Sequence, residues 1–117
     1  MQYLMLIHSV EARDGFSRRD EAEQRKIVGE YQALSEVPGV LGGNQLQPAD
    51  TATTVRVEDG QTLTTDGPFI EAKEALGGYF LYEADNLDAA IAMAARIPAA
   101  RMGGAVEVRP ILERPAP

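Results

Sequence analysis

The sequence predicts an α+β fold in which two helices cover one face of an antiparallel sheet. The first observation is a continuous apolar run at residues 3–7, which is typical of a central strand covered on both faces. The second is the order of the patterns that follow, which is strand, helix, strand, hairpin, strand, helix, strand. Without the hairpin, this order is the split β-α-β arrangement of ferredoxin-like domains. We therefore expect a ferredoxin-like fold with an inserted β-hairpin.

Composition and charge are those of a single globular domain, residues 1–117, with a short Pro-rich tail at about residues 114–117. The 18 acidic residues outnumber the 11 basic ones, and the formal net charge of -7 argues against nucleic-acid and membrane partners. The apolar residues 1–7 are too few for a signal peptide or a membrane span. The chain has no cysteine, which fits a reducing compartment, so we expect a cytoplasmic protein.

The first strand is expected to end at His8, and the polar residues 9–16 follow it. Residues 17–20, Ser-Arg-Arg-Asp, resemble a capping box with an acid in place of the usual Glu or Gln, so a helix should begin there. Pro38 and Gly39 end this helix. Its apolar face consists of side chains at helical spacing: Ile27, Val28, Tyr31 and Leu34.

A strand and a hairpin are expected next. Residues 40–46 can form a strand, although Gly42 and Gly43 indicate a bulge or a close backbone approach. Residues 53–58 alternate between two faces, and an Asp-Gly turn separates them from residues 61–64. An Asp-Gly pair between alternating segments is a strong hairpin signal, so we expect a two-stranded flap.

The second half of the chain is expected to form a strand, a helix and a strand. Residues 78–84 are rich in aromatic residues and favour a strand, and residues 85–86, Asp-Asn, offer a cap for the helix that follows. Pro98 marks the end of that helix. Residues 105–109 alternate as a half-buried strand, whose far end Pro110 confines to an edge or a bend. The apolar stripe of the helix consists of Leu87, Ala90, Ile91 and Ala94.

The expected topology brings three distant segments together. Its first strand lies at the centre, antiparallel to the third and fourth strands of the main sheet. His8 should therefore meet the loop of residues 66–78 and the loop of residues 98–104, which carries Arg101, at one edge of the sheet. The helix-free face of such a sheet is uncovered, and its apolar residues, from the strand near residues 79–82, need a partner. Burial against a second copy is worth roughly 25 cal/mol per Å² of apolar area, so we expect a homodimer.

Residues 66–80 form a dense cluster of turn, charged and glycine residues directly before a strand. Loops on a rigid scaffold are where binding and catalytic groups concentrate. We therefore expect this segment to line one edge of a small-molecule cleft.

The same segment carries a family resemblance. Asp66-Gly67-Pro68-Phe69, followed by Glu71, Lys73, Glu74 and Leu76-Gly77-Gly78-Tyr79, closely resembles the signature of the YCII-related family, in the branch named for its DGPFAETKE motif. Residues 94–98, Arg101 and residues 106–110 are similar to the C-terminal pattern of that branch, so the resemblance covers nearly the whole chain. Ile70 and Ala72 depart from the motif, which has Ala and Thr there. The resemblance implies a dimeric α/β barrel with a cleft, in a family whose function is mostly uncharacterised.

The resemblance also raises the question of a catalytic pair. A related member resembles a dehydrochlorinase that acts on a chlorinated hydroquinone, and other relatives carry a His-Asp pair whose His lies on the first helix. That position corresponds to the neighbourhood of Val28, and His8 is the single histidine of the chain. A proton-transfer dyad would therefore combine His8 with Asp66. Alternatively, His8 is a capping or hydrogen-bonding residue at a strand end, and Asp66 bonds its own turn backbone.

Candidate ligand contacts come from the same edge of the sheet. Arg101 can hold a carboxylate or phenolate in a forked pair, or it can bridge to Glu71 or Glu74. Lys73 and its acidic neighbours can equally form a solvated face, and Tyr79 can lie in the cleft, the core or the dimer interface. The candidates are Phe69, Glu71, Lys73, Tyr79 and Arg101. A single histidine without cysteine makes a poor transition-metal site, and no phosphate-binding glycine loop is present, so we expect no metal and no cofactor.

Two functions follow from these expectations. The first is a dimeric small-molecule-binding or regulatory module whose cleft is lined by residues 66–80. The alternative is a small-molecule enzyme, a lyase or isomerase similar to the dehydrochlorinase, which transfers protons with His8 and Asp66. We favour the binding module, because the helix histidine of the relatives is absent near Val28.

Overall fold

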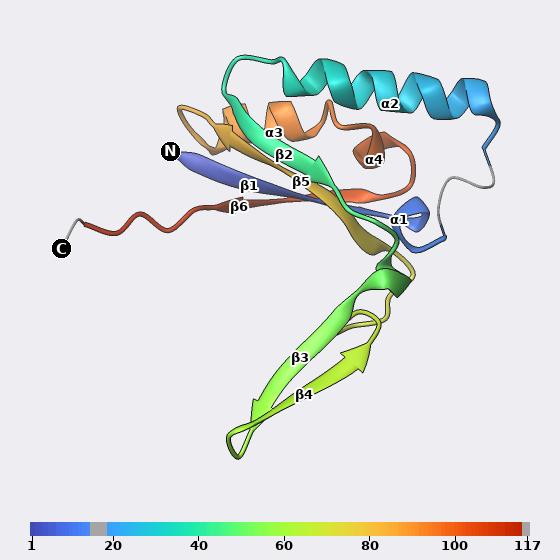
Figure 1. Ribbon diagram of the computed structural model, residues 1–117. Coiled ribbons are helices and arrows are strands. Elements are labelled where there is room, and N and C mark those ends of the chain that lie inside the picture. Colours follow the sequence, from blue (N-terminus) through green and yellow to red (C-terminus); the bar gives the residue numbers. More distant parts are fainter. Residues whose placement is uncertain (15–18, 116–117) are drawn as a thin grey trace.

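A four-stranded antiparallel sheet in the order β2-β5-β1-β6 forms the centre of the fold (Figure 1). The computed structural model describes residues 1–14 and 19–115, with only the backbone described at residues 13–14. The strand order is compatible with a ferredoxin-like fold, and β1 lies between β5 and β6, antiparallel to both, as predicted. The strands are β1 Gln2–Ser9, β2 Val40–Gln45, β5 Ala75–Glu83 and β6 Ala105–Pro110.

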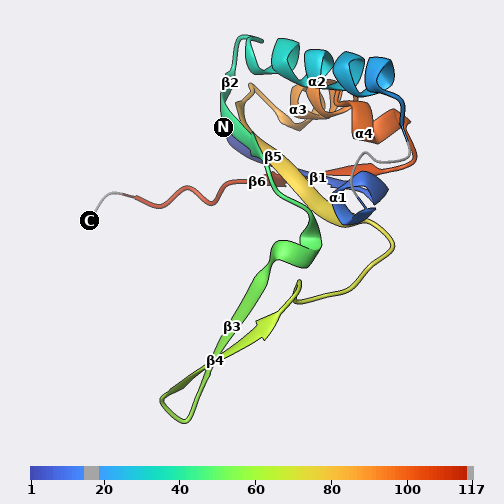
Figure 2. The same ribbon diagram turned by 45° about the vertical axis from the view of Figure 1, so that its right-hand side comes forward.

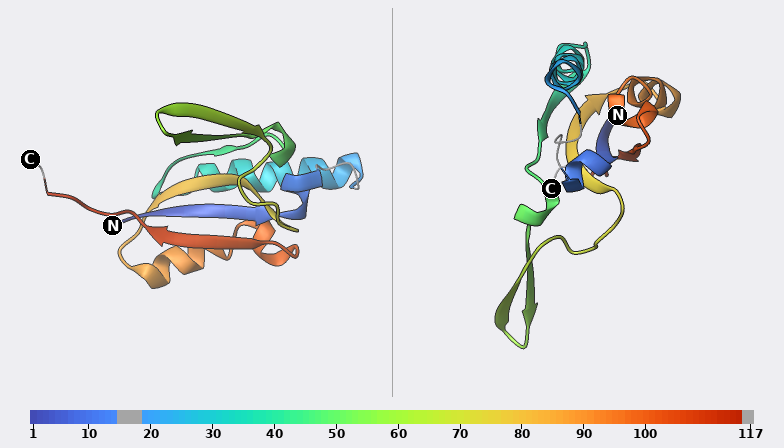
Figure 3. Two further views of the ribbon diagram at one scale, coloured as in Figure 1. Left: turned by 90° about the horizontal axis from the view of Figure 1, so that it is seen from below. Right: turned by 90° about the vertical axis from the view of Figure 1, so that its right-hand side faces the viewer.

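The helices α2, α3 and α4 lie on one face of the sheet, as predicted, and α1 follows the end of β1 (Figures 1 and 3). Asp20 caps α2, because its carboxylate accepts a hydrogen bond from the backbone N of Glu23 at 2.7 Å. Ser17, the first residue of the predicted capping box, lies outside the described residues. The helices are α1 Val10–Asp14, α2 Glu21–Ser35, α3 Leu87–Ala94 and α4 Pro98–Arg101, with a 3₁₀ turn η1 at Ala49–Thr51.

Two short helices differ from the expectations. Helix α1 occupies part of the polar residues 9–16, where no helix was expected, because five residues are too few to show a helical period. Pro98 was expected to end the helix, but α3 already ends at Ala94, and Pro98 begins α4 instead. Proline suits a first helical turn, since its fixed φ fits there and no intrahelical donor is lost. Arg101 therefore lies in the last turn of a helix rather than in a loop.

The core lies between β1, β5 and the helices. Along β1, Tyr3, Met5 and Ile7 are buried beneath the helices, whereas the alternating Leu4 and Leu6 are partly exposed on the other face. The buried stripe of α3 differs from the predicted one, because Leu87 and Ile91 are half exposed and Met93 is buried instead. Met93 lies three positions after Ala90 and therefore on the same side of the helix. The buried face of α3 is thus rotated about the helix axis from the face that was expected. The buried residues of α3 are Ala90, Met93 and Ala94.

The predicted hairpin is confirmed, with β3 at Thr53–Glu58 and β4 at Gln61–Asp66. Asp59 and Gly60 connect the strands, with φ values of 51° and 76°. Positive φ at both central residues is the requirement of a type I′ turn, which explains the Asp-Gly pair. The hairpin projects from the sheet on the side opposite to the helices (Figures 1 and 2).

Candidate functional site

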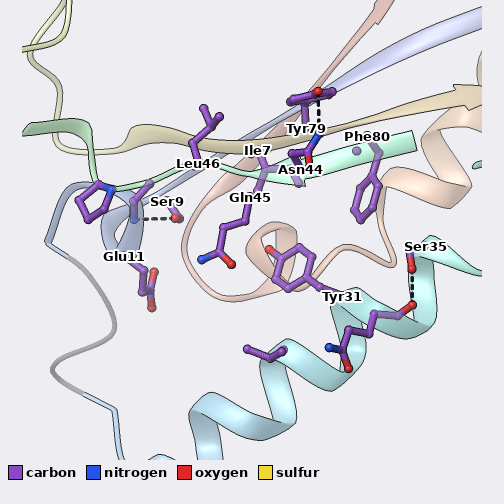
Figure 4. Close-up of a pocket in the computed structure, with 17 residues that line it drawn as sticks. Ile7, Ser9, Glu11, Tyr31, Ser35, Asn44, Gln45, Leu46, Tyr79 and Phe80 are labelled. Carbon is purple, nitrogen blue, oxygen red and sulfur yellow. Dashed lines mark hydrogen bonds between the residues drawn. The ribbon is translucent and has the colours of Figure 1, made fainter. Parts of the chain in front are cut away.

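A cavity of about 350 Å³ lies between α2 and the strands β2 and β5 (Figure 4). Its walls come from four parts of the chain that are distant in sequence: the end of β1 with α1, the helix α2, the segment from β2 to Pro48, and β5. Most of the wall surface is apolar, with contributions from Ile7, Val28, Leu46 and Phe80. An apolar cavity with a few polar groups is the usual form of a small-molecule site.

Tyr31 is the central polar group of this cavity. Its ring stacks on the ring of Phe80, with centroids 6.4 Å apart and an interplanar angle of 23°. Burial raises the pKa of the Tyr31 phenol above the ordinary value of 10.0, while a backbone hydrogen bond with Ala99 opposes this rise and the Glu11 carboxylate adds to it. The phenol therefore stays neutral near pH 7 and offers an O–H donor.

An ion pair occupies the α1 side of the cavity. Glu11 lines the cavity, and its Oε1 accepts a hydrogen bond from Arg19 Nε at 2.7 Å and a second one from Arg19 Nη2. Both side chains are mostly shielded from solvent, with exposed fractions of 21% and 26%. Both donors reach the same carboxylate oxygen, so the positive guanidinium lies directly against Glu11 and offsets its charge. A bound molecule would therefore meet a polar rim rather than a free anion.

The double glycine of residues 77–78 allows the walls to approach one another. A Cβ at Gly77 would lie 2.7 Å from the Cβ of Ala12 in α1, and a Cβ at Gly78 would lie 2.8 Å from the backbone O of Asn44 in β2. Both distances are too short for a real side chain. The glycines therefore let α1 and β2 pack directly against β5, at the place where these elements line the cavity.

The structure places His8 where the topology predicted, between β5 and β6, but on the face away from the cavity. His8 pairs with Leu76 in β5 and with Ala105 in β6. Its Nε2 lies 3.5 Å from Oε1 of Glu107. Asp66 is exposed and pairs with Thr53 at the base of the hairpin. In the part of the chain that the structure describes, the polar contact of the His8 ring is with Glu107 and not with Asp66.

The five candidate ligand contacts are not brought together. Phe69 is exposed, and the guanidinium of Arg56 lies 4.8 Å from its ring centroid. Glu71 and Lys73 are exposed. Arg101 forms an ion pair with Glu30 of α2. The described partner of Arg101 is therefore an acid of α2 and not Glu71 or Glu74, one of its two expected alternatives.

Tyr79 is the one candidate among the residues that line the cavity. It pairs with Leu6 in β1, which belongs to the helix-free face, and its hydroxyl accepts a hydrogen bond from Asn44 Nδ2 at 3.0 Å. Figure 4 shows the Tyr79 ring on the side of the sheet away from Tyr31. Its ring therefore belongs to the opposite face, although the residue forms part of the wall.

The polar groups of the cavity were not among the candidate contacts. Tyr31 was expected as part of an apolar helix face. Its hydroxyl could have indicated a binding group, because a tyrosine among aliphatic residues brings a polar group into the core. Glu11 gave no such signal, since α1 is too short to show a period. Val28 lines the cavity with an exposed fraction of 43%.

Among residues 1–14 and 19–115, no three His, Cys, Asp or Glu side chains come close enough together to hold a metal ion. Within the same ranges, no helix combines the length and the apolar character needed to cross a membrane.

Comparison with known proteins gives a consistent result. A family model described as "YCII-related domain" matches residues 1–114. The chain is also similar to "Uncharacterized protein R00369" of Rhizobium meliloti (strain 1021), with 32% identity over 114 residues, which cover 95% of this chain and 92% of that protein. Both matches span nearly the whole chain.

Proposed function

This chain belongs to the YCII-related domain family, and we propose that it is a small-molecule-binding module whose ligand occupies the cavity between α2 and the sheet. The observation that carries the proposal is the cavity itself, about 350 Å³ in size, with an aromatic pair and a few polar groups set in apolar walls. A volume above about 300 Å³ suits a small organic ligand.

The walls define the chemistry of this ligand. The Tyr31 ring and the Gln45 amide point into the space between α2 and β2 (Figure 4). The neutral phenol donates a hydrogen bond, and the amide can donate or accept. Among the described residues that line the cavity, Glu11 is the charged one, and its pairing with Arg19 weakens the attraction of the rim for an ion. We therefore propose a small, uncharged aromatic ligand that carries a hydrogen-bond acceptor such as a carbonyl or hydroxyl oxygen.

We favour binding over proton-transfer catalysis. The alternative enzyme, a lyase similar to the dehydrochlorinase, would need His8 and Asp66 at the ligand. His8 instead pairs with Glu107 on the helix-free side of the sheet, and the cavity wall carries Val28 where the relatives' histidine is expected.

We further propose that the protein is a cytoplasmic homodimer that pairs through the helix-free face of its sheet. Leu4, Leu6 and Leu81 are partly exposed on this face and alternate with the buried residues. Burying them against a second copy would remove apolar surface from water at both subunits.

A binding screen with two matched variants tests the cavity as the site. The probes are a panel of one-ring and two-ring phenols, hydroxybenzaldehydes and pyridones, and the readout is the melting temperature followed by calorimetric Kd for the hits. Val28→Phe fills the cavity and should abolish binding. Ile70→Phe, which makes a similar change in the exposed loop of residues 67–74, should leave Kd unchanged.

The two variants also distinguish a binding site in the cavity from one in the loop of residues 67–74. Binding that survives Val28→Phe but is lost in Ile70→Phe would place the site at the loop and contradict the proposal. Turnover of a hit by the wild-type protein would favour the alternative enzyme.

A further inference from the structure

The hairpin of residues 53–66, here called the arm, is exposed on both of its faces. Every residue of β4 is exposed, and in β3 only Thr54 is partly shielded. Val55 and Val57 have exposed fractions of 59% and 67%. A two-stranded hairpin without a packing partner is marginally stable in water. The arm therefore needs a surface to pack against.

The two faces of the arm differ in charge. The strand register places Val55 opposite Thr64 and Val57 opposite Thr62, so one face presents valine side chains and threonine methyl groups. The other face carries Arg56 and Glu58, and Arg56 covers the ring of Phe69. The valine face carries Asp66 only at its base, opposite Thr53, and is uncharged around Val55 and Val57. This uncharged part loses little on desolvation and is the part suited to burial.

Within the described residues, the rest of the chain does not supply a surface for the valine face. The arm projects away from the sheet in Figures 1 and 2 and in the right panel of Figure 3. The radius of gyration is 16.2 Å, whereas a compact chain of 117 residues has about 13 Å. The chain is therefore more extended than a compact domain of its length, and the projecting arm is part of that extension.

The uncovered sheet face lies on the same side as the arm (Figure 3). A strand of six residues is about 20 Å long and strands lie about 4.8 Å apart, so the sheet offers roughly 400 Å² of flat area and the arm roughly 200 Å². Because side chains protrude from these surfaces, their accessible area exceeds the flat area. This brings the total toward the roughly 800 Å² per partner that a stable interface buries. The sheet alone falls well short of that value, and a second copy of the chain presents both surfaces at once.

We propose that the arm is a clasp, which packs its Val55 and Val57 face against a second copy of this chain and extends the interface of the sheet. The proposal rests on the homodimer proposed above. A two-fold axis would make the contact reciprocal, because each subunit contributes one arm and receives the other.

A pair of lysine substitutions tests the clasp by sedimentation equilibrium. Val57→Lys buries an unpaired charge and should raise the dissociation constant of the dimer at least about tenfold. Gln61→Lys adds the same charge near the same end of the arm but on its other face. This control should change the dissociation constant of the dimer less than about twofold. Equal dissociation constants for the wild type and Val57→Lys would overturn the clasp and leave the sheet interface intact.

Single-cysteine labels give a second measurement, because the chain has no native cysteine. A nitroxide on Val57→Cys should be immobilised in the dimer and become mobile on dilution, whereas one on Glu58→Cys should be mobile throughout. A mobile label at position 57 in the dimer, or an immobile one in the monomer, would overturn the clasp. A wild-type protein that stays monomeric would overturn the clasp and the homodimer, while binding of the aromatic probes in the cavity would be unaffected.

Discussion

Tyr31 and Phe80 stack inside the protein with ring centroids 6.4 Å apart, and this contact joins α2 to β5 at the wall of the cavity. One ring comes from the long helix and the other from a central strand. The pair therefore links the stability of the core to the shape of the proposed binding site.

The first prediction concerns Phe80, which has an exposed fraction of 7%. Phe80→Ala should lower the free energy of unfolding by about 3–5 kcal/mol, because it removes a buried ring and leaves a void. Phe69→Ala makes the same change at a ring with an exposed fraction of 67%, and should cost less than about 1 kcal/mol. Urea denaturation of the two variants measures both values. Equal losses would show that the aromatic pair does not support the core.

The second prediction concerns the pH dependence of stability. Burial raises the pKa of Tyr31 in the folded protein above 10.0. As pH rises past the unfolded pKa, the unfolded chain releases this proton while the folded protein keeps it, so the contribution of Tyr31 to stability falls. That contribution is complete below about pH 9 and declines toward the folded pKa.

Tyr31→Phe removes this titration and supplies the control. The difference in unfolding free energy between wild type and Tyr31→Phe should shift in favour of the variant between about pH 9 and pH 11. Urea denaturation across this range measures the difference. A difference that stays constant with pH would mean that the phenol titrates alike in the folded and unfolded states.

The third prediction concerns the glycines at the cavity wall. Gly77→Ala places a Cβ 2.7 Å from the Cβ of Ala12, so α1 must shift and stability should fall by about 1–3 kcal/mol. Gly42→Ala is the matched control, because no heavy atom lies within 4 Å of its added Cβ. That variant should stay within about 1 kcal/mol of the wild type. Thermal unfolding distinguishes the two, and a Gly77 variant as stable as the Gly42 variant would refute close packing of α1 on β5.

Much of the fold could be predicted because its signals are local. The Asp59-Gly60 turn has the two positive φ values that its sequence favours, and the apolar run of β1 lies at the centre of the sheet. The face of α3 could not be predicted as well, because Leu87 and Met93 are both apolar. Which of them is buried depends on how the helix lies on the sheet.

The candidate site was harder to predict, because it depends on relations between elements. His8 was expected at its edge of the sheet, but its contact with Glu107 follows from the pairing of β1 with β6. Tyr31 faces the cavity because α2 crosses β2 and β5 with space between them. No pattern of neighbouring residues in the sequence predicts that space. A sequence motif such as residues 66–69 attracts attention, although none of these residues lines the cavity.

The most direct test of the central claim is the Kd of the best aromatic probe for Tyr31→Phe and for Tyr79→Phe, measured by calorimetry. Each variant loses one phenol hydroxyl, but only that of Tyr31 belongs to the cavity side of the sheet. We expect Tyr31→Phe to weaken binding about tenfold, the loss of one hydrogen bond, and Tyr79→Phe to change it less than about twofold. Unchanged affinity in Tyr31→Phe, or a larger loss in Tyr79→Phe, would contradict a ligand bound between α2 and the sheet.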